Sequence, residues 1–424
     1  MALKDFRPMM DRCSNCLGCK WIAFDKVKSL RFGENCPSVC YNNFNTYSAR
    51  GRFRLGQIIL DNDAEYTDEV MNVVHSCMSC GACDVSCKIC RYNLEPLDHN
   101  IALKADAVKR DKILPAQHVM IQALKEEKTM IPGAAKANRG DWAKGLDLKD
   151  IFKENAAVAF FPGCKYSYTE KLQGVARSAA KLLLDAGVDL GTLGEADTCC
   201  AGRAYQMGFI DEFDERAEAN IKAFKTAGVK TIVTPCSDCY HTFKRLYAAK
   251  GMDIEVLHIV EYIDRLISDG KIKFTKSIPM TVTYHDPCHL GRQGEPYVAW
   301  DGQEKKIRNQ IHTWDPKRPR YNGAYGIYDA PRNILNAIPG VELVEMERIR
   351  ENTWCCGAGG GCSETYPEMS EWTASERVTE ANATGAEALV TACPWCESNF
   401  ANAVDENGKN IQVFDIIELV QRAL

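Results

Sequence analysis

Twenty-one cysteines stand in this chain of 424 residues, and their spacing is typical of thiolate ligands. The C-terminal part repeats one pattern twice: a single cysteine, an adjacent pair and a CxxC motif. The two copies are Cys164, Cys199, Cys200, Cys236, Cys239 and then Cys288, Cys355, Cys356, Cys393, Cys396. Adjacent cysteines diverge from one backbone, so they suit neighbouring atoms of a polynuclear cluster better than a single ion. The pattern therefore favours iron–sulfur chemistry.

The first 125 residues contain two further groups of cysteines, one CxxCxxC followed by Cys-Pro and one CxxCxxCxxxC. Three closely spaced thiolates bind one face of a cubane [4Fe–4S] cluster, and two-cluster ferredoxins exchange the fourth ligand between motifs. We therefore predict one cubane cluster on Cys13, Cys16, Cys19 and Cys87. A second is predicted on Cys36, Cys77, Cys80 and Cys83.

Two cysteines of this region have no role in that assignment. Sixteen residues separate Cys19 from Cys36, so Cys40 is an alternative to Cys36 as a ligand, and Cys90 is an alternative to Cys87. Both also suit small buried positions beside the clusters. The sequence leaves these alternatives open.

Composition narrows the class of protein. Hydrophobic content of 46% and charged content of 26% are ordinary globular values, and a net charge of −5 gives no reason to expect nucleic-acid binding. No apolar run reaches about 18 residues and the start lacks a signal peptide, so we expect a cytoplasmic protein without a membrane span. Thiols stay reduced there, which disfavours disulfides. Structural zinc would explain the CxxC pairs but not the adjacent cysteines.

The elements that position these cysteines follow from the surrounding residues. Short apolar, β-branched runs lead directly into cysteines at 157–164, 229–239, 280–288 and 387–396, and a helical pattern covers 169–186. Alternating strands and helices predict parallel α/β sheets, with ligands at the carboxyl ends of the strands. We expect α + α/β architecture: a helical ferredoxin-like domain (1–128), a linker (129–155) and two α/β domains (156–277 and 278–424).

The two repeats keep their register except at one place. The adjacent pairs are offset by 156 residues and the CxxC motifs by 157, whereas the leading cysteines are offset by 124. About thirty extra residues therefore lie in the second copy, at about 293–327, in a segment rich in Lys, Arg, Trp, Tyr and Pro. We interpret it as a surface excursion packed on its domain or as a partner-docking or lid element.

The repeated pattern resembles the cysteine-rich CCG domain. The phrases YHDPCHLGR (284–292), YDAPR (328–332) and WCCGAGGG (354–361) look like its second copy, and FFPGC and TPCSDC look like its first. With two ferredoxin motifs in front, nearly the whole chain resembles the D-type component of heterodisulfide reductase, which is itself like a fusion of the C-type and B-type components.

That resemblance implies two cubane clusters in front and, in each CCG motif, a non-cubane [4Fe–4S] cluster held by five cysteines. Ala201 stands where the first motif would have its glycine. The function implied is an iron–sulfur subunit of an anaerobic oxidoreductase complex, passing electrons through the cubanes to the CCG clusters, where a disulfide is reduced. The alternative is a pure electron-transfer subunit of a flavoprotein–quinone oxidoreductase or benzoyl-CoA reductase type of complex. Expected partners are a flavoprotein, cytochrome or reductase subunit, with peripheral membrane association through that partner.

Several other residues stand beside these motifs. Gly357 and Gly359 make a flexible loop that would let a cofactor or substrate approach the backbone, and Cys362 after it is a reactive thiol or a passive neighbour. His285 and His289 bracket Cys288 and would deliver protons in disulfide cleavage, or only support the cluster thiolates.

Overall fold

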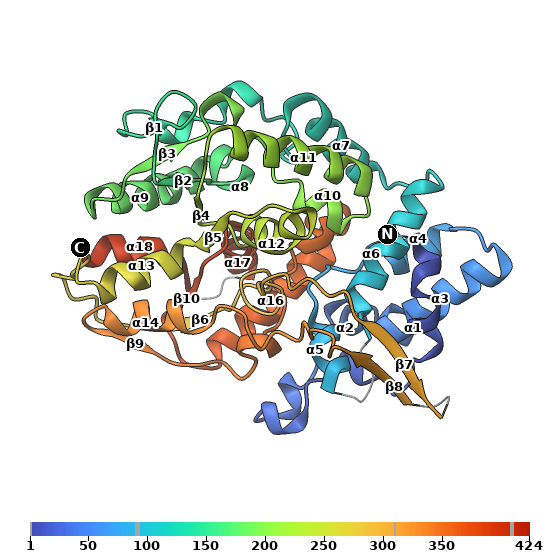
Figure 1. Cartoon of the computed structure of the whole chain (residues 1–424). Helices are drawn as coiled ribbons and strands as arrows, with labels where there is room; N and C mark the ends of the chain where they lie inside the picture. The colour runs from blue at the N-terminus through green and yellow to red at the C-terminus, as the bar shows by residue number, and fades with distance from the viewer. Residues whose placement is uncertain (1, 90–93, 309–310, 408–410) are drawn as a thin grey trace.

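The computed structural model describes residues 2–89, 94–308, 311–407 and 411–424. Figure 1 shows the N-terminal helices at the right, the first α/β unit above and the second α/β unit below it. Helices dominate, and both large sheets consist of parallel strands. The predicted α + α/β fold class is confirmed.

The N-terminal part consists of helices, as expected for a helical ferredoxin-like domain. Side-chain oxygens of Ser48 and Thr67 accept from backbone N–H groups at the starts of α3 and α4, and prolines open α2, α6 and α7. The helices are α1 (Arg7–Asp11), α2 (Pro37–Asn42), α3 (Ala49–Asn62), α4 (Asp68–His75), α5 (Ala82–Ile89), α6 (Pro96–Lys109) and α7 (Pro115–Glu127).

The first repeat has a five-stranded parallel sheet in the order β1-β3-β2-β4-β5. Its strands are β1 (Lys149–Asp150), β2 (Val158–Phe160), β3 (Leu190–Thr192), β4 (Thr231–Thr234) and β5 (Glu255–His258). Its α-helices are α8 (Cys164–Tyr168), α9 (Glu170–Asp185), α10 (Gly202–Gln206), α11 (Ile210–Thr226), α12 (Ser237–His241) and α13 (Ile259–Ser268). Strand β1 comes from the segment expected to be a linker, so part of 129–155 is the edge of this sheet.

The second repeat has a four-stranded parallel sheet in the order β11-β10-β6-β9. Its strands are β6 (Met280–Tyr284), β9 (Val341–Leu343), β10 (Ala388–Thr391) and β11 (Gln412–Asp415). Its helices are α14 (Asp329–Ala337), α15 (Cys362–Thr365), α16 (Pro367–Asn382), α17 (Pro394–Asn407) and α18 (Ile416–Ala423). The last helix of each repeat begins with the same capping box, His258 with Glu261 and Asp415 with Glu418.

The extra residues of the second repeat contain an antiparallel hairpin, β7 (Gln303–Ile307) with β8 (Ile311–Asp315). The side chains of β7 are exposed along its whole length. Several contacts tie the segment to the N-terminal domain; among them, Lys88 Nζ donates to the Tyr321 carbonyl at 2.6 Å, and Arg12 pairs with Glu304 at 2.6 Å. The segment therefore packs on the neighbouring domain as well as its own, and a docking role for its hairpin stays a prediction.

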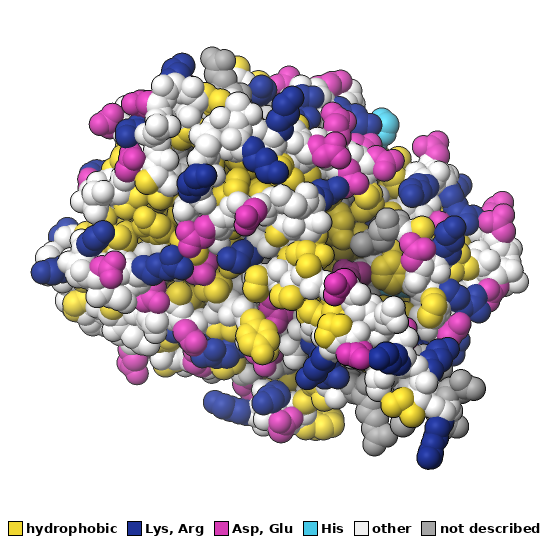
Figure 2. Space-filling view, in the orientation of Figure 1, with side chains coloured by type: hydrophobic (Ala, Val, Ile, Leu, Met, Phe, Trp, Pro, Cys, Tyr) yellow, Lys and Arg dark blue, Asp and Glu magenta, His cyan; other side chains and the backbone are white. Residues whose placement is uncertain are grey.

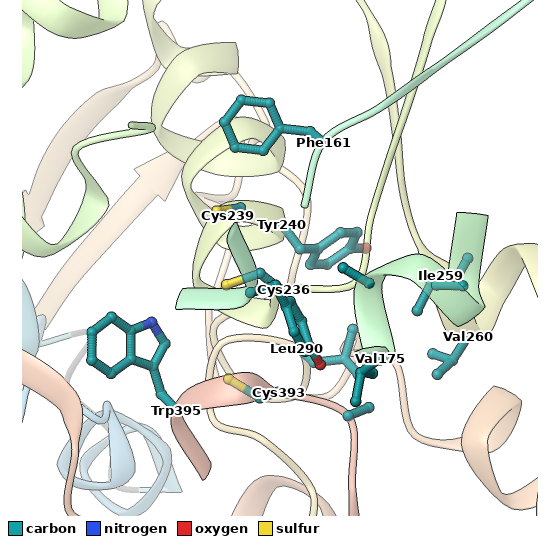
Figure 3. Close-up of a cluster of buried hydrophobic side chains, with 14 of the residues drawn as sticks. Phe161, Val175, Cys236, Cys239, Tyr240, Ile259, Val260, Leu290, Cys393 and Trp395 are labelled. Carbon is teal, nitrogen blue, oxygen red and sulfur yellow. The ribbon is translucent and has the colours of Figure 1, made fainter. Parts of the chain in front are cut away.

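One hydrophobic core runs through both repeats. Buried polar contacts also cross the boundary: Tyr166 Oη donates to Asp415 at 2.6 Å, and Ser237 Oγ donates to the Ala392 carbonyl at 2.8 Å. The carboxyl ends of β4 and β10 thus meet, which brings the CxxC motifs that follow them together. Figure 3 shows Cys236 and Cys393 from these two motifs on facing segments, with Trp395 beside them.

Candidate metal centres

Site 1 is a cavity near the surface of the N-terminal domain. Three of its thiols come from the first motif and the fourth from α5: Cys13, Cys16, Cys19 and Cys87. Asn15 and Leu17 between them have left-handed backbone conformations, with φ of 59° and 60°. These two turns curl the loop so that its cysteines face one cavity. The structure therefore brings together the four cysteines of the first predicted cubane set.

Site 2 is a second cavity, deeper in the same domain, lined by Cys36, Cys77, Cys80 and Cys83. These are the four cysteines of the other predicted cubane set. Cys40 lies outside the lining, and its thiol donates to Glu34 Oε2 at 3.1 Å. Burial and that hydrogen bond raise the pKa of Cys40, which keeps it a neutral thiol. Cys90 lies outside the described residues.

Site 3 gathers the five cysteines of the first repeat, Cys164, Cys199, Cys200, Cys236 and Cys239, around one cavity. A Cβ on Gly163 would lie 2.8 Å from Cys239 Sγ, which explains the glycine of the Pro-Gly-Cys motif. Arg139, from the segment predicted to be a linker, donates to Cys164 Sγ at 3.3 Å. Sequence reasoning missed this residue, because nothing in the local pattern of the segment points to Cys164.

Site 4 consists of the second repeat's cysteines: Cys288, Cys355, Cys356, Cys393 and Cys396. Hydrogen bonds join Cys355 to Cys288 and to Cys356, and join Cys396 to Cys356 and to Cys393. The hydrogen bond from Cys355 lowers the pKa of Cys288 to about 6, so this thiol ionises readily. All five cysteines are buried.

The adjacent pairs of sites 3 and 4 have the same local geometry. The backbone N–H of Ala201 donates to Cys199 Sγ at 3.3 Å, and that of Gly357 donates to Cys355 Sγ at 3.3 Å. Ala201 adopts φ +57°, where glycine is the usual residue, so the replacement of that glycine leaves the loop conformation intact.

Two thiol contacts connect three of the sites. Cys80 of site 2 packs in the same cluster as Cys355 of site 4, and interaction with the Cys355 side chain lowers the pKa of Cys80 to about 5. Cys236 of site 3 is hydrogen-bonded to Cys393 of site 4. The three sets of thiols therefore form one continuous row, in the order site 2, site 4, site 3.

The loop Gly357–Gly361 lies against this row. A Cβ on Gly360 would come within 2.6 Å of the Cys77 carbonyl, and one on Gly359 would clash with the Met78 carbonyl. The close approach expected of this glycine loop is thus made by the backbone of site 2. A cofactor-binding role for Gly357 and Gly359 stays a prediction.

Two buried cations flank the contact between sites 2 and 4. Arg292 Nε donates to the Cys80 carbonyl at 2.6 Å, and its Nη1 donates to the Thr353 carbonyl at 2.6 Å. Lys104 is fully buried and donates to the Cys77 carbonyl at 2.7 Å and to the Gln206 carbonyl at 3.2 Å. Their positive charges lie where thiolates would accumulate negative charge.

The two candidate histidines, His285 and His289, have different neighbours. His289 pairs through Nδ1 with Asp238 at 2.5 Å, which links sites 3 and 4, and its ring is 5.0 Å from that of His241. Burial opposes its charged form, but Cys288 and Asp238 raise the pKa of His289 well above its usual value. Burial lowers the pKa of His285, whose Nδ1 accepts from Arg377 at 3.1 Å. Only His289 lies between the two five-cysteine sets.

Cys362 is completely buried, and its thiol donates to the His75 carbonyl at 3.5 Å. It packs with Met78, Cys355 and Met369 at the contact between sites 2 and 4. These surroundings match the passive neighbour of the two sequence interpretations, while a reactive role stays a prediction.

All twenty cysteines in the described ranges are free thiols. Within those ranges, no three Cys, His, Asp or Glu side chains lie close enough to bind one metal ion.

Comparison with known proteins places this arrangement in a family. Residues 158–244 and 318–401 match the cysteine-rich domain family CCG. The D-type component of dihydromethanophenazine:CoB–CoM heterodisulfide reductase from Methanosarcina mazei is 32% identical over 84% of this chain and 79% of its own length. The chain belongs to the family of D-type heterodisulfide reductase components. Its predicted membership is confirmed, and so is its class, an iron–sulfur oxidoreductase component.

Two further similarities extend the comparison. EtfAB:quinone oxidoreductase from Syntrophomonas wolfei is 25% identical over 83% of this chain, which spans 46% of that protein. The crystal structure of a hypothetical protein from Helicobacter pylori covers 89% of this chain and 67% of its own, with a TM-score of 0.51 at 12% identity, so it supports the fold alone. In the described parts of this family member, no helix is long and apolar enough to cross a membrane.

Proposed function

We propose that this chain is the electron-relay subunit of a redox complex, with four iron–sulfur clusters held by the four cysteine sites. Sites 1 and 2 offer four thiols each around one cavity, which suits a cubane [4Fe–4S] group. Site 3 offers five thiols around one cavity, and site 4 offers five thiols, which suits the non-cubane type. Bound clusters would supply reversible one-electron transfer.

The observation that carries this proposal is the row of thiol contacts. The Cys355 side chain lowers the pKa of Cys80, and burial together with the Cys393 side chain raises the pKa of Cys236, so the thiols of sites 2, 4 and 3 lie close enough to influence one another. Site 1 shares α5 with site 2, because Cys83 and Cys87 are one helical turn apart on that helix. The four cysteine sites thus follow one another in space, from site 1 at the surface through sites 2 and 4 to site 3 at the boundary between the repeats.

The electron-relay proposal is tested by colour and spectroscopy. The anaerobically purified chain should be brown, should bleach with dithionite, and should recover its colour with a one-electron oxidant. A colourless protein containing zinc would contradict the proposal. Two relatives are named as subunits of a heterodisulfide reductase and of a fumarate reductase, and we propose a flavoprotein, cytochrome or reductase subunit as the partner here.

A second function, disulfide reduction at sites 3 and 4, is favoured by His289. Its Nδ1 proton is held by Asp238, and its buried Nε2 has no hydrogen-bond partner among the described residues. This nitrogen is therefore available to a thiolate leaving a substrate disulfide, which needs one proton per thiol formed.

Turnover of thiol disulfides with reduced viologen, under anaerobic conditions, tests that function. His289→Gln should lower the rate by about a hundredfold while bleaching by dithionite is kept. His285→Gln is the matched histidine variant and should slow turnover less. A fully loaded wild-type chain that reduces no disulfide would remove this second function and leave the electron relay.

A further inference from the structure

Site 1, which shares α5 with site 2, is the cysteine site with an exposed thiol. Cys16 is the one exposed cysteine in the part of the chain that the structure describes, whereas all ten cysteines of sites 3 and 4 are buried. Electron exchange between proteins requires close approach, so a partner that exchanges electrons with this chain gains most by docking over Cys16.

The surroundings of Cys16 are rich in Lys and Arg. Residues 12–54 contain eight Lys and Arg against two Asp and Glu. Arg52 is buried, and Arg12 and Arg31 pair with Glu304 and Glu376, so the cations that remain for a partner are Lys20, Lys26, Lys28, Arg50 and Arg54. Arg50 lines the site 1 cavity and donates to Asn15 at 3.1 Å, and Lys20 donates to Asn45 at 3.0 Å. Arg54 follows Arg50 by one helical turn on α3 and is exposed.

Apolar side chains are exposed in the same stretch. Phe44 is 64% exposed and stands next to Asn45, which binds Lys20. Phe24 and Leu30, in the loop that follows Cys19, are 71% and 76% exposed. In Figure 2, Lys and Arg side chains alternate with Asp and Glu side chains at the right of the molecule, where the N-terminal helices lie. Exposed aromatic side chains among positive charges are typical of a protein-docking surface.

We propose that this basic face, defined by Cys16, Lys20, Phe44, Arg50 and Arg54, docks a small acidic protein that carries single electrons. The proposal rests on the electron-relay function and names the class of partner for site 1. Complementary charge would steer the acidic carrier to Cys16, and Phe44 would supply apolar contact once it is there. Each encounter moves one electron from the reduced carrier to this chain, or in the opposite direction, and breaks no bond.

Stopped-flow reduction of the full chain by a reduced acidic [4Fe–4S] ferredoxin tests the face. The wild-type rate should fall at least tenfold between low salt and about 0.5 M salt, because salt screens steering. The double variant K20E/R54E should be about tenfold slower at low salt. The control K222E/K225E makes the same change of charge at two exposed positions on α11 and should keep the wild-type rate.

A small-molecule reductant distinguishes a variant that has lost ferredoxin docking from one that has lost its clusters. Photoreduced deazaflavin needs no docking face, so it should reduce wild type, variant and control alike at equal iron content. If the rate of reduction by ferredoxin depends neither on salt nor on the K20E/R54E substitutions, the docking proposal is wrong, while the electron-relay function is not contradicted. If the chain instead binds anionic phospholipid vesicles and its ferredoxin rates do not depend on salt, the basic face binds a membrane surface rather than an acidic protein. A fully loaded chain that deazaflavin cannot reduce would overturn the relay function itself.

Discussion

Arg292 Nε donates a hydrogen bond to the Cys80 carbonyl, 2.6 Å away, and thereby ties the second repeat to the N-terminal domain. The remaining nitrogen, Nη2, is buried and has no hydrogen-bond partner among the described residues. Cys80, Cys288 and Cys355 raise the pKa of Arg292 against the effect of its burial, so the guanidinium keeps its charge. A fixed positive charge therefore lies between the thiols of sites 2 and 4.

Removal of this charge should make the neighbouring sites harder to reduce. Arg292→Met is expected to lower the midpoint potential of site 2 or site 4 by about 60 mV, a tenfold change for one electron. Arg292→Lys retains the charge, so its midpoint potentials should lie closer to those of the wild type. EPR-monitored redox titration at equal iron content measures the shift, with Lys225→Met as the control; unchanged potentials in Arg292→Met would show that the charge has no such effect.

The glycine loop should be intolerant of a side chain at Gly360. Gly360 and Gly385 both have positive φ, +62° and +77°, but only at Gly360 would a Cβ meet a backbone oxygen, at 2.6 Å from Cys77 O. Gly385→Ala should cost about 1 kcal/mol of stability from backbone strain alone, and Gly360→Ala about 3 kcal/mol or more. Anaerobic denaturant unfolding measures both; equal losses would argue against tight contact between the loop and site 2.

Substitution of Cys36 and Cys40 distinguishes the two alternatives that the sequence left open. Cys36 lines site 2, whereas Cys40 lies outside it and bonds Glu34. Cys36→Ser should therefore lower the iron content by up to about four atoms per chain, and Cys40→Ser should retain it. Iron analysis of the two purified variants measures this. The reverse result would make Cys40 the ligand.

A buried network of ion pairs lies next to site 4, where Arg377 contacts His285, three residues before Cys288. Glu380 pairs with Arg348 at 2.9 Å and with Arg377 at 2.6 Å, and Arg377 also bonds His285. Burial opposes its charged form, but these arginines lower the pKa of Glu380. Glu380→Gln should cost about 3–5 kcal/mol at pH 7, since it leaves the buried Arg377 without a carboxylate and Arg348 with Glu376 alone.

The sign of the pH dependence follows from that lowered pKa. The stability contributed by the Glu380 carboxylate is complete above its unfolded pKa of about 4.3 and is lost as pH falls through the lower folded value. The difference in unfolding free energy between wild type and Glu380→Gln should therefore be constant from pH 6 to pH 8 and shrink below about pH 4. A difference that grew toward low pH would contradict the assignment.

The sequence predicted the features that depend on spacing. Cysteines three residues apart, and a strand pattern before each CxxC, were enough to predict the parallel sheets and which cysteines line a common cavity. Both follow from local geometry, since a short loop or one turn of helix limits where its thiols lie. The role of these cysteines as cluster ligands stays a prediction.

The contacts between sites could not be predicted in this way. Cys80 with Cys355 and Cys236 with Cys393 are far apart in the chain, and their meeting depends on how three domains pack. Arg139 was hidden in a segment that looked like a linker, although its buried guanidinium bonds Cys164. Tertiary packing, rather than motif spacing, decides these positions.

Iron and acid-labile sulfide per chain, measured on anaerobically purified protein together with Mössbauer spectroscopy, test the central claim most directly. The four sites predict about sixteen iron and sixteen sulfide per chain, with two spectral classes for the four-thiol and five-thiol sites. Removal of both five-thiol sites, for example by Cys200→Ser with Cys356→Ser, should abolish one class and spare the other. About eight iron in one cubane class in the wild-type chain would contradict cluster binding at sites 3 and 4.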